Sequence, residues 1–182
     1  MKVLLALECS ETGTAAAEAI SSWAVENRAD VHLFTVLHPK DIHETVGSSG
    51  YAHTTTPQGT PSGQLLSGLK DPQGRVAEDR TQALERAHSE RRDYLSQVVN
   101  ARFPGLNTEV EVFDSTETAE AIVDAADRTG ADFIAMATRG KAGIGQALFG
   151  TIHEDVVRHA HVPVLLVGPG AKQLQGAVQV KQ

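Results

Sequence analysis

The chain has 182 residues, 41% of them hydrophobic, which is enough for one domain with a buried core and short for two. Its 23 acidic residues against 16 lysines and arginines give a net charge of −7, which would repel a nucleic-acid backbone. No apolar run approaches the roughly 20 residues that span a bilayer. The amino-terminal MKVLLALECSE also turns acidic too early for a signal peptide. We therefore expect a cytoplasmic protein that binds neither nucleic acid nor membrane.

Five short segments predict β-strands. VLLAL (3–7), VHLFTVL (31–37), FIAMA (133–137) and PVLLVG (163–168) are mostly apolar and rich in branched residues, as buried strands are. The remaining one, TEVEVF (108–113), alternates polar and apolar residues, which is typical of a strand near a sheet edge.

Helical segments are expected between these strands. They cover residues 11–28, 76–102 and 118–128, and another helix begins at Thr151. The alternation of strand and helix predicts an α/β fold, a parallel sheet with helices on both faces, because right-handed crossovers join parallel neighbours.

Two stretches stand outside this pattern. Residues 39–74 are dominated by Gly, Ser, Thr and Pro and predict a long insertion, either a plain disordered loop or a lid or docking segment. Residues 171–182 form a polar tail that we expect to be poorly ordered. The expected organisation is a single domain at 1–170 followed by this tail.

The stretch ATRGKAGIGQALFGT (137–151) is rich in glycine but fits neither common phosphate motif. A P-loop fails because Gly140 and Lys141 are followed by Ala142 rather than Ser or Thr. The dinucleotide fingerprint fails because Gly143-x-Gly145 has no third glycine three residues later.

Two interpretations of this stretch stay open. The amides at the start of the following helix could bind an anion, with Arg139 and Lys141 beside them as ligands or as ordinary surface cations. Alternatively, Thr151 and Glu154 form a capping box and the stretch is only a flexible turn.

The residues after the first strand also allow more than one interpretation. Glu8 is either a ligand for a hydroxyl or amino group or a carboxylate that favours the next helix dipole. Ser10 is expected to be a helix N-cap. Cys9, the single cysteine, excludes an internal disulfide; we expect a small buried filler, with a redox sensor of lowered pKa as the minor alternative.

The histidines do not predict a metal site. His159 and His161 would point to different faces of a helix, and His153 with Glu154 matches no tight ligand spacing. No Ser, His and Asp arrangement for nucleophilic catalysis can be assigned.

Gly140, then nine residues, then Gly150-Thr151, followed by a helix and PVLLV, resembles the universal stress protein family. Nucleotide-binding members of that family carry G-x-x-G, nine residues, then G and Ser or Thr. LLALECSETG also resembles the family's first strand and turn, and HVPVLLV its last strand.

The resemblance implies a Rossmann-like, three-layer α/β/α fold of the adenine nucleotide alpha hydrolase type. It implies a five-stranded parallel sheet of order 3-2-1-4-5, and ATP, with any Mg²⁺ carried by the nucleotide, bound between strands 1 and 4. It further implies a homodimer through the last strand, from Pro163 to Val167. The apolar pattern of that strand supports the dimer independently, because an uncovered apolar edge invites aggregation.

Carried over by position, the resemblance assigns a role to each element around the ATP. The adenine and ribose would be bordered by Ala6, Leu7 and Glu8, with Val36 beside the base and Met136 and Ala137 on the ribose side. The phosphates would be held by Gly140, Gly150, Thr151 and Ile152, with Arg139 adding charge.

Two residues depart from the family pattern. Ala137 stands where the first glycine is usual, and Glu8 stands where Asp is usual. Since the phosphate half is intact, we expect nucleotide binding to be retained, at weakened affinity.

Three functions therefore compete. The first is a nucleotide-binding stress or signalling protein with at most slow ATP hydrolysis. The second is a nucleotide-free family member that acts as a protein-interaction module. The third is an enzyme with a redox step at Cys9.

Overall fold

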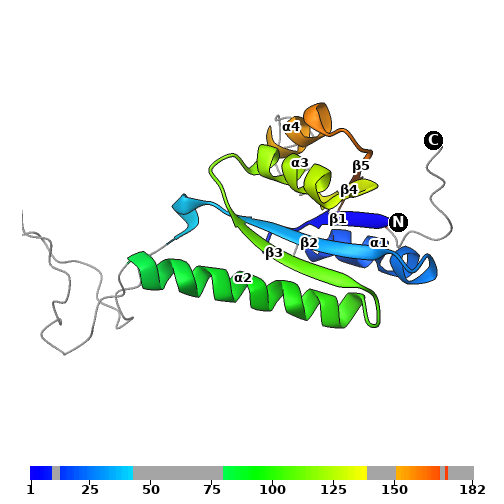
Figure 1. Ribbon diagram of the computed structural model, residues 1–182, viewed down its shortest axis with the longest axis horizontal. Coiled ribbons are helices and arrows are strands. Elements are labelled where there is room, and N and C mark those ends of the chain that lie inside the picture. The colour runs from blue at the N-terminus through cyan, green and yellow to red at the C-terminus, as the bar shows by residue number, and fades with distance from the viewer. Residues whose placement is uncertain (10–12, 43–79, 139–150, 169–170, 172–182) are drawn as a thin grey trace, which may run out of the picture.

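The computed structural model describes residues 1–9, 13–42, 80–138, 151–168 and 171. Five parallel strands form one sheet of order β3-β2-β1-β4-β5, which confirms the predicted fold class and strand order (Figure 1). The strands are β1 Lys2–Ala6, β2 Asp30–Leu37, β3 Thr108–Asp114, β4 Phe133–Ala137 and β5 Val164–Val167. Each lies within one or two residues of its predicted bounds, because short apolar runs mark buried strands well.

Helices cover both faces of this sheet. In Figure 1, α1 (Thr14–Glu26) and α2 (Arg80–Arg102) lie below the strands, while α3 (Thr118–Thr129) and α4 (Thr151–His159) lie above them. The hydrophobic core is likewise divided into two parts, one on each face of the sheet, since successive side chains of a strand point to opposite faces. Leu5 and Leu33 pack on the α1 side, whereas Leu4 and Phe34 pack on the α3 side.

The core on the α1 side is centred on the single tryptophan. Trp23 is fully buried, and its ring meets that of Phe133 edge to face with centroids 5.2 Å apart. This geometry places the positive edge of one ring against the negative face of the other. The contact holds α1 on β4, one of the three strands whose ends border the cavity described below.

The start of α1 corrects one prediction. The helix begins at Thr14 and Gly13 occupies the N-cap position, so Ser10 is not the N-cap of this helix. The buried face of α1 begins at Ala16, and the first turn forms where that face starts to pack on the sheet. Ser10 itself lies outside the described residues.

Of the predicted insertion at 39–74, only the first four residues are described. Pro39–Asp41 forms a short 3₁₀ helix, η1, in which the His38 side chain accepts a hydrogen bond from the Lys40 amide at 3.0 Å. Residues 43–79 lie outside the description, as does all of the predicted tail except Ala171. The single domain at 1–170 therefore stays a prediction. No helix in the described ranges is both long and apolar enough to cross a membrane.

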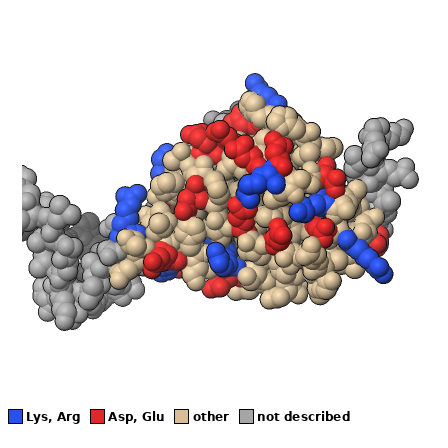
Figure 2. Space-filling view, in the orientation of Figure 1, with Lys and Arg blue, Asp and Glu red and all other residues tan. Residues whose placement is uncertain are grey.

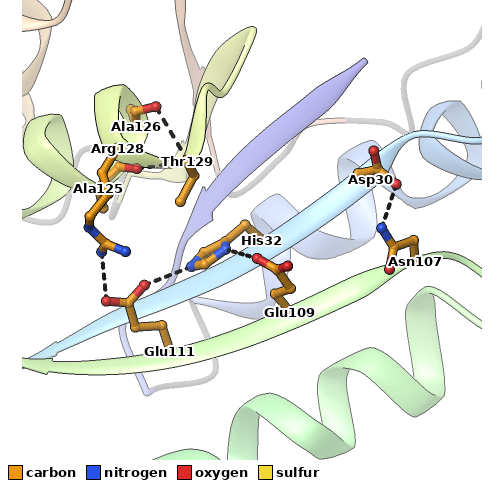
Figure 3. A network of polar contacts seen from close by, with 9 residues as sticks. All are labelled: Asp30, His32, Asn107, Glu109, Glu111, Ala125, Ala126, Arg128 and Thr129. Carbon is orange, nitrogen blue, oxygen red and sulfur yellow. Dashed lines mark hydrogen bonds and ion pairs between the residues drawn. The ribbon is translucent and has the colours of Figure 1, made fainter.

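A polar cluster sits on the β2–β3 side of the sheet (Figure 3). His32 is only 6% exposed, and its two ring nitrogens each lie 2.9 Å from a carboxylate, Nδ1 from Glu109 and Nε2 from Glu111. Glu111 also accepts a hydrogen bond from Arg128 of α3 at 2.7 Å. The cluster gives a buried imidazole its partners and ties the edge strand β3 to α3.

The surface carries charges of both signs. Figure 2 shows acidic and basic side chains interspersed over the described part of the visible face, without a continuous basic patch there. The acidic side chains visible on this face are therefore mixed with basic ones.

Candidate functional site

A cavity of about 230 Å³ opens at the carboxyl ends of β1, β2 and β4. The strand order reverses between β1 and β4, because β2 follows β1 on one side and β4 lies on the other. Open parallel sheets bind ligands at this kind of reversal, where the loops on either side diverge. The lining residues come from strands, helices and η1 alike: Ala6, Leu7, Glu8, Cys9, Gly13, Phe34, Thr35, Val36, His38, Asp41, Arg91, Thr118, Ile122, Met136, Ala137, Ile152 and His153.

The cavity brings together every described residue for which a nucleotide contact is predicted. These are Ala6, Leu7, Glu8, Val36, Met136, Ala137 and Ile152. Thr151 begins α4, but its side chain is not described, and Arg139, Gly140 and Gly150 lie outside the described residues. The predicted adenosine side and the first turn of α4 therefore face a common space.

The sheet ladder builds the floor of this cavity. Ala6 of β1 is in register with Phe34 on one side and with Met136 on the other. The Leu7 amide donates to the Phe34 carbonyl at 2.9 Å, so the backbone stays ordered one residue beyond the end of β1. These four side chains are all at most 8% exposed, which makes the floor apolar and suited to a flat ring.

Ala137 adopts a backbone conformation that alanine tolerates. Among the described non-glycine residues only Arg28 has a positive φ, at 49°, so Ala137 lies outside the left-handed region. The missing glycine of the family pattern therefore introduces no backbone strain at this position.

Glu8 lines the cavity beside β1, and Tyr94 of α2 contacts its backbone. The Tyr94 hydroxyl donates to the Glu8 carbonyl at 3.4 Å. Burial, with smaller contributions from the charges of Cys9 and Glu8, raises the pKa of Tyr94 to about 12. The phenol therefore keeps its proton at neutral pH and continues to support the backbone at Glu8.

Cys9 differs from both expectations for it. It is exposed rather than a buried filler, and its sulfur lies 3.8 Å from the Thr35 hydroxyl. Partial burial of the sulfur raises the pKa of the Cys9 thiol, against the lowering effects of the Thr35 hydrogen bond and the Arg91 charge. The prediction of a lowered pKa is wrong because desolvation of the thiolate outweighs the nearby cation.

An ion pair closes the side of the cavity near η1. Arg91 of α2 lies 3.1 Å from the Asp41 carboxylate, and the two side chains are 18% and 52% exposed. A guanidinium this shielded interacts more strongly than one in open water.

His153 connects two walls of the cavity. Its Nε2 donates a hydrogen bond to the Ala137 carbonyl at 2.7 Å, joining the first turn of α4 to the last residue of β4. Its Nδ1 is buried and has no hydrogen-bond partner among the described residues. Glu154 pairs with Arg158 at 2.7 Å, so its carboxylate has a partner other than the capping contact considered above.

The remaining histidines of the metal hypothesis have separate partners. His159 contacts the Asp155 carbonyl at 2.8 Å, and His161 contacts the Asp127 carboxylate at 2.8 Å. Within the described part of the chain, no three His, Cys, Asp or Glu residues gather as metal ligands would.

Comparison with known proteins places this architecture in a family. The sequence pattern of the "Universal stress protein family" matches residues 1–168. The chain belongs to the universal stress protein family.

Relatives of this universal stress protein agree with its fold. Universal stress protein MJ0531 of Methanocaldococcus jannaschii is 36% identical over 69 residues, which are 38% of this chain and only 40% of that relative. The solved hypothetical protein MJ0577 superimposes with a TM-score of 0.64 at 18% identity, over 94% of this chain and 97% of its own. A universal stress protein solved in complex with cAMP gives a TM-score of 0.56 at 15% identity, over 92% of this chain and 96% of its own.

The cavity of this universal stress protein also contains residues that sequence reasoning missed. Arg91 reaches it from α2, His38 from the end of β2 and Asp41 from η1, and no local motif marks them. His153 follows the family motif by two residues, and its place in the first turn of the predicted helix was a usable signal.

Proposed function

We propose that this universal stress protein binds ATP in the cavity at the carboxyl ends of β1, β2 and β4, and acts in stress response or signalling. The observation that carries the proposal is that the described residues matching the family's nucleotide contacts line one cavity. A relative of the same fold was solved with cAMP, which supports an adenine nucleotide as the ligand.

The adenine and ribose occupy the β1 and β2 side of the cavity in this proposal. Ala6 and Leu7 supply the apolar floor, Val36 lies beside the base, and the Glu8 carboxylate accepts hydrogen bonds from the ribose. Glu8 is exposed, which leaves room for the extra methylene relative to the usual Asp.

The ribose and phosphates extend from β4 toward α4. Met136 and Ala137 line the ribose side, and the first-turn amides at Thr151 and Ile152 are directed at the phosphates. Helix amino termini favour anions because their amides lack intrahelical partners. Gly140, Gly150 and Arg139 complete the phosphate contacts in the family pattern.

Any ATP hydrolysis is proposed to be slow. The family motif supplies backbone amides and a hydroxyl for phosphate binding, with no assigned general base to orient a water molecule. Nucleotide binding would then act through the stability or partner affinity of the protein rather than through turnover.

A homodimer through β5 belongs to the same proposal. β5 is an edge strand of the described sheet, and Val164, Leu165 and Leu166 are each partly exposed along it. Apolar edge strands are normally covered by a partner, since their free backbone groups otherwise promote aggregation.

Nucleotide release tests the proposal directly. The purified protein is denatured and its supernatant chromatographed for adenine nucleotide, and thermal unfolding is followed with and without millimolar ATP and Mg²⁺. We expect bound nucleotide or an upward shift of the melting temperature. The absence of both would reject ATP binding and leave the nucleotide-free interaction module as the function.

A glycine pair locates the phosphates. Gly150→Val should abolish ATP binding by blocking the phosphate amides, whereas Gly145→Val, in the spacer of the same motif, should retain it. Equal affinities in the two variants would contradict the assignment of Gly150.

A further inference from the structure

We propose that His153 is a positioning residue that fixes the first turn of α4 to the end of β4 and thereby couples the phosphate side of the cavity to its ribose side. The proposal rests on the proposed ATP site. It adds a residue that the family pattern does not assign. The atom that acts, Nε2 of His153, contacts the protein backbone rather than the ligand.

The contact lies where β1 and β4 separate. The Ile134 and Thr138 amides both donate to the β5 side, so by alternation the carbonyl of Ala137 points toward β1. The pairing of β1 with β4 ends at Ala6 and Met136, so it supplies no amide donor to that carbonyl. The Nε2–H of His153 supplies a donor there, at 2.7 Å.

This contact determines the tautomer of the ring. A carbonyl only accepts hydrogen bonds, so Nε2 carries the proton and neutral His153 presents a lone pair at Nδ1. That Nδ1 is buried without a partner among the described residues. A buried unsatisfied group costs about 1–3 kcal/mol. Within the described residues, the Nε2 contact is therefore the hydrogen bond that orients this ring.

The restraint acts on the proposed phosphate contacts. Ile152 precedes His153 in the first turn of α4, and both residues line the cavity together with Met136 and Ala137. Fixing the imidazole to the Ala137 carbonyl fixes the Ile152 amide relative to the ribose side. Amides that are held in position before the ligand arrives bind a phosphate without a further ordering cost.

Paired ligands and paired variants test this role. ATP and adenosine affinities are measured by calorimetry for the wild type, His153→Leu and His153→Gln, with His159→Leu as a control on the exposed side of the same helix. We expect His153→Leu to weaken ATP about tenfold, or about 1.4 kcal/mol, while adenosine binding changes little. His153→Gln should restore most of the ATP affinity, because its amide N–H can donate to the same carbonyl.

Several outcomes would overturn the proposal. One is an equal loss of ATP and adenosine affinity in His153→Leu, which indicates general damage, and another is no loss of either. If the wild type binds neither ligand, the ATP site itself is rejected, and the restraint is judged on the ligand-free protein. Hydrogen exchange in the peptide covering α4 should then be faster in His153→Leu than in His153→Gln or His159→Leu, and unchanged exchange in His153→Leu would rule the restraint out.

Discussion

The guanidinium of Arg91 pairs with the carboxylate of Asp41 at 3.1 Å on one side of the cavity. The two residues are 50 positions apart in the chain, one on α2 and one in η1, and both line the cavity. The same guanidinium lowers the pKa of Cys9, although burial of the thiol has the larger, opposite effect. One side chain therefore links the shape of the cavity to the reactivity of its only cysteine.

Arg91→Ala should make Cys9 less reactive. Removing the cation takes away an effect that lowers the pKa of the Cys9 thiol, so that pKa rises further and less thiolate is present at any pH below it. The rate of alkylation by iodoacetamide, measured from pH 7 to 10, should fall and its midpoint move to higher pH. Arg92→Ala, at the exposed neighbouring position, is the control and should leave the profile in place. A faster reaction in Arg91→Ala would show that access, rather than charge, limits Cys9.

Glu111→Gln should destabilise the fold more than Glu109→Gln. Glu111 is 23% exposed and contacts both His32 and Arg128, whereas Glu109 is 62% exposed and contacts His32 at the open end of the cluster. We expect the free energy of unfolding to fall by about 1–2 kcal/mol for Glu111→Gln, because a shielded pair is disrupted. The loss for Glu109→Gln should be below about 1 kcal/mol. Urea denaturation at neutral pH measures both values, and equal losses would contradict a role for burial in this cluster.

Ala137→Gly should increase neither the stability of the protein nor its affinity for ATP, even though glycine is usual at this position in the family. The residue lies in β4 without a positive φ, so glycine relieves no strain and only increases the freedom of the unfolded chain. We expect a loss of about 0.5–1 kcal/mol in stability and no gain in ATP affinity. Arg28→Gly is the opposite control, since φ there is 49° and glycine should be neutral or stabilising. Thermal unfolding measures the change in stability and calorimetry the change in ATP affinity. Tighter ATP binding by Ala137→Gly would show that the Ala137 methyl crowds the ligand.

Leu166→Pro should convert the proposed dimer to a monomer. The Thr138 amide bonds the Val167 carbonyl and the Ile134 amide the Pro163 carbonyl, so alternation directs the Leu166 amide away from β4. Proline at this position removes an outward donor and leaves the ladder to β4 unbroken. Val112→Pro makes the matching change on the opposite edge strand, β3, and should leave the mass measured by light scattering unaltered. A dimer that persists in Leu166→Pro would place the interface elsewhere.

The strands and the α/β class could be predicted from local pattern, and the strand order from the family resemblance. Each buried strand is a short apolar run, and the alternation in TEVEVF correctly marked β3 as an edge strand. The helix beginnings were less accurate, as Gly13 rather than the predicted Ser10 occupies the N-cap of α1. Capping residues are common near many possible starts, and packing against the sheet selects among them.

Some residues of the candidate site could also be predicted from the sequence, and others could not. Glu8 could be proposed from the sequence because parallel strands bring their carboxyl ends together, whereas Met136 and Ile152 were proposed from the family resemblance. Arg91, Asp41 and the Nε2 contact of His153 depended on where α2 and α4 cross those ends, and no local pattern encodes a crossing. The sequence by itself determined the strands and the layers through short-range periodicity, and the family through the spacing of Gly140, Gly150 and Thr151. The tertiary structure alone decided which distant charges face the cavity and which imidazole nitrogen holds its proton, because both depend on contacts between elements far apart in the chain.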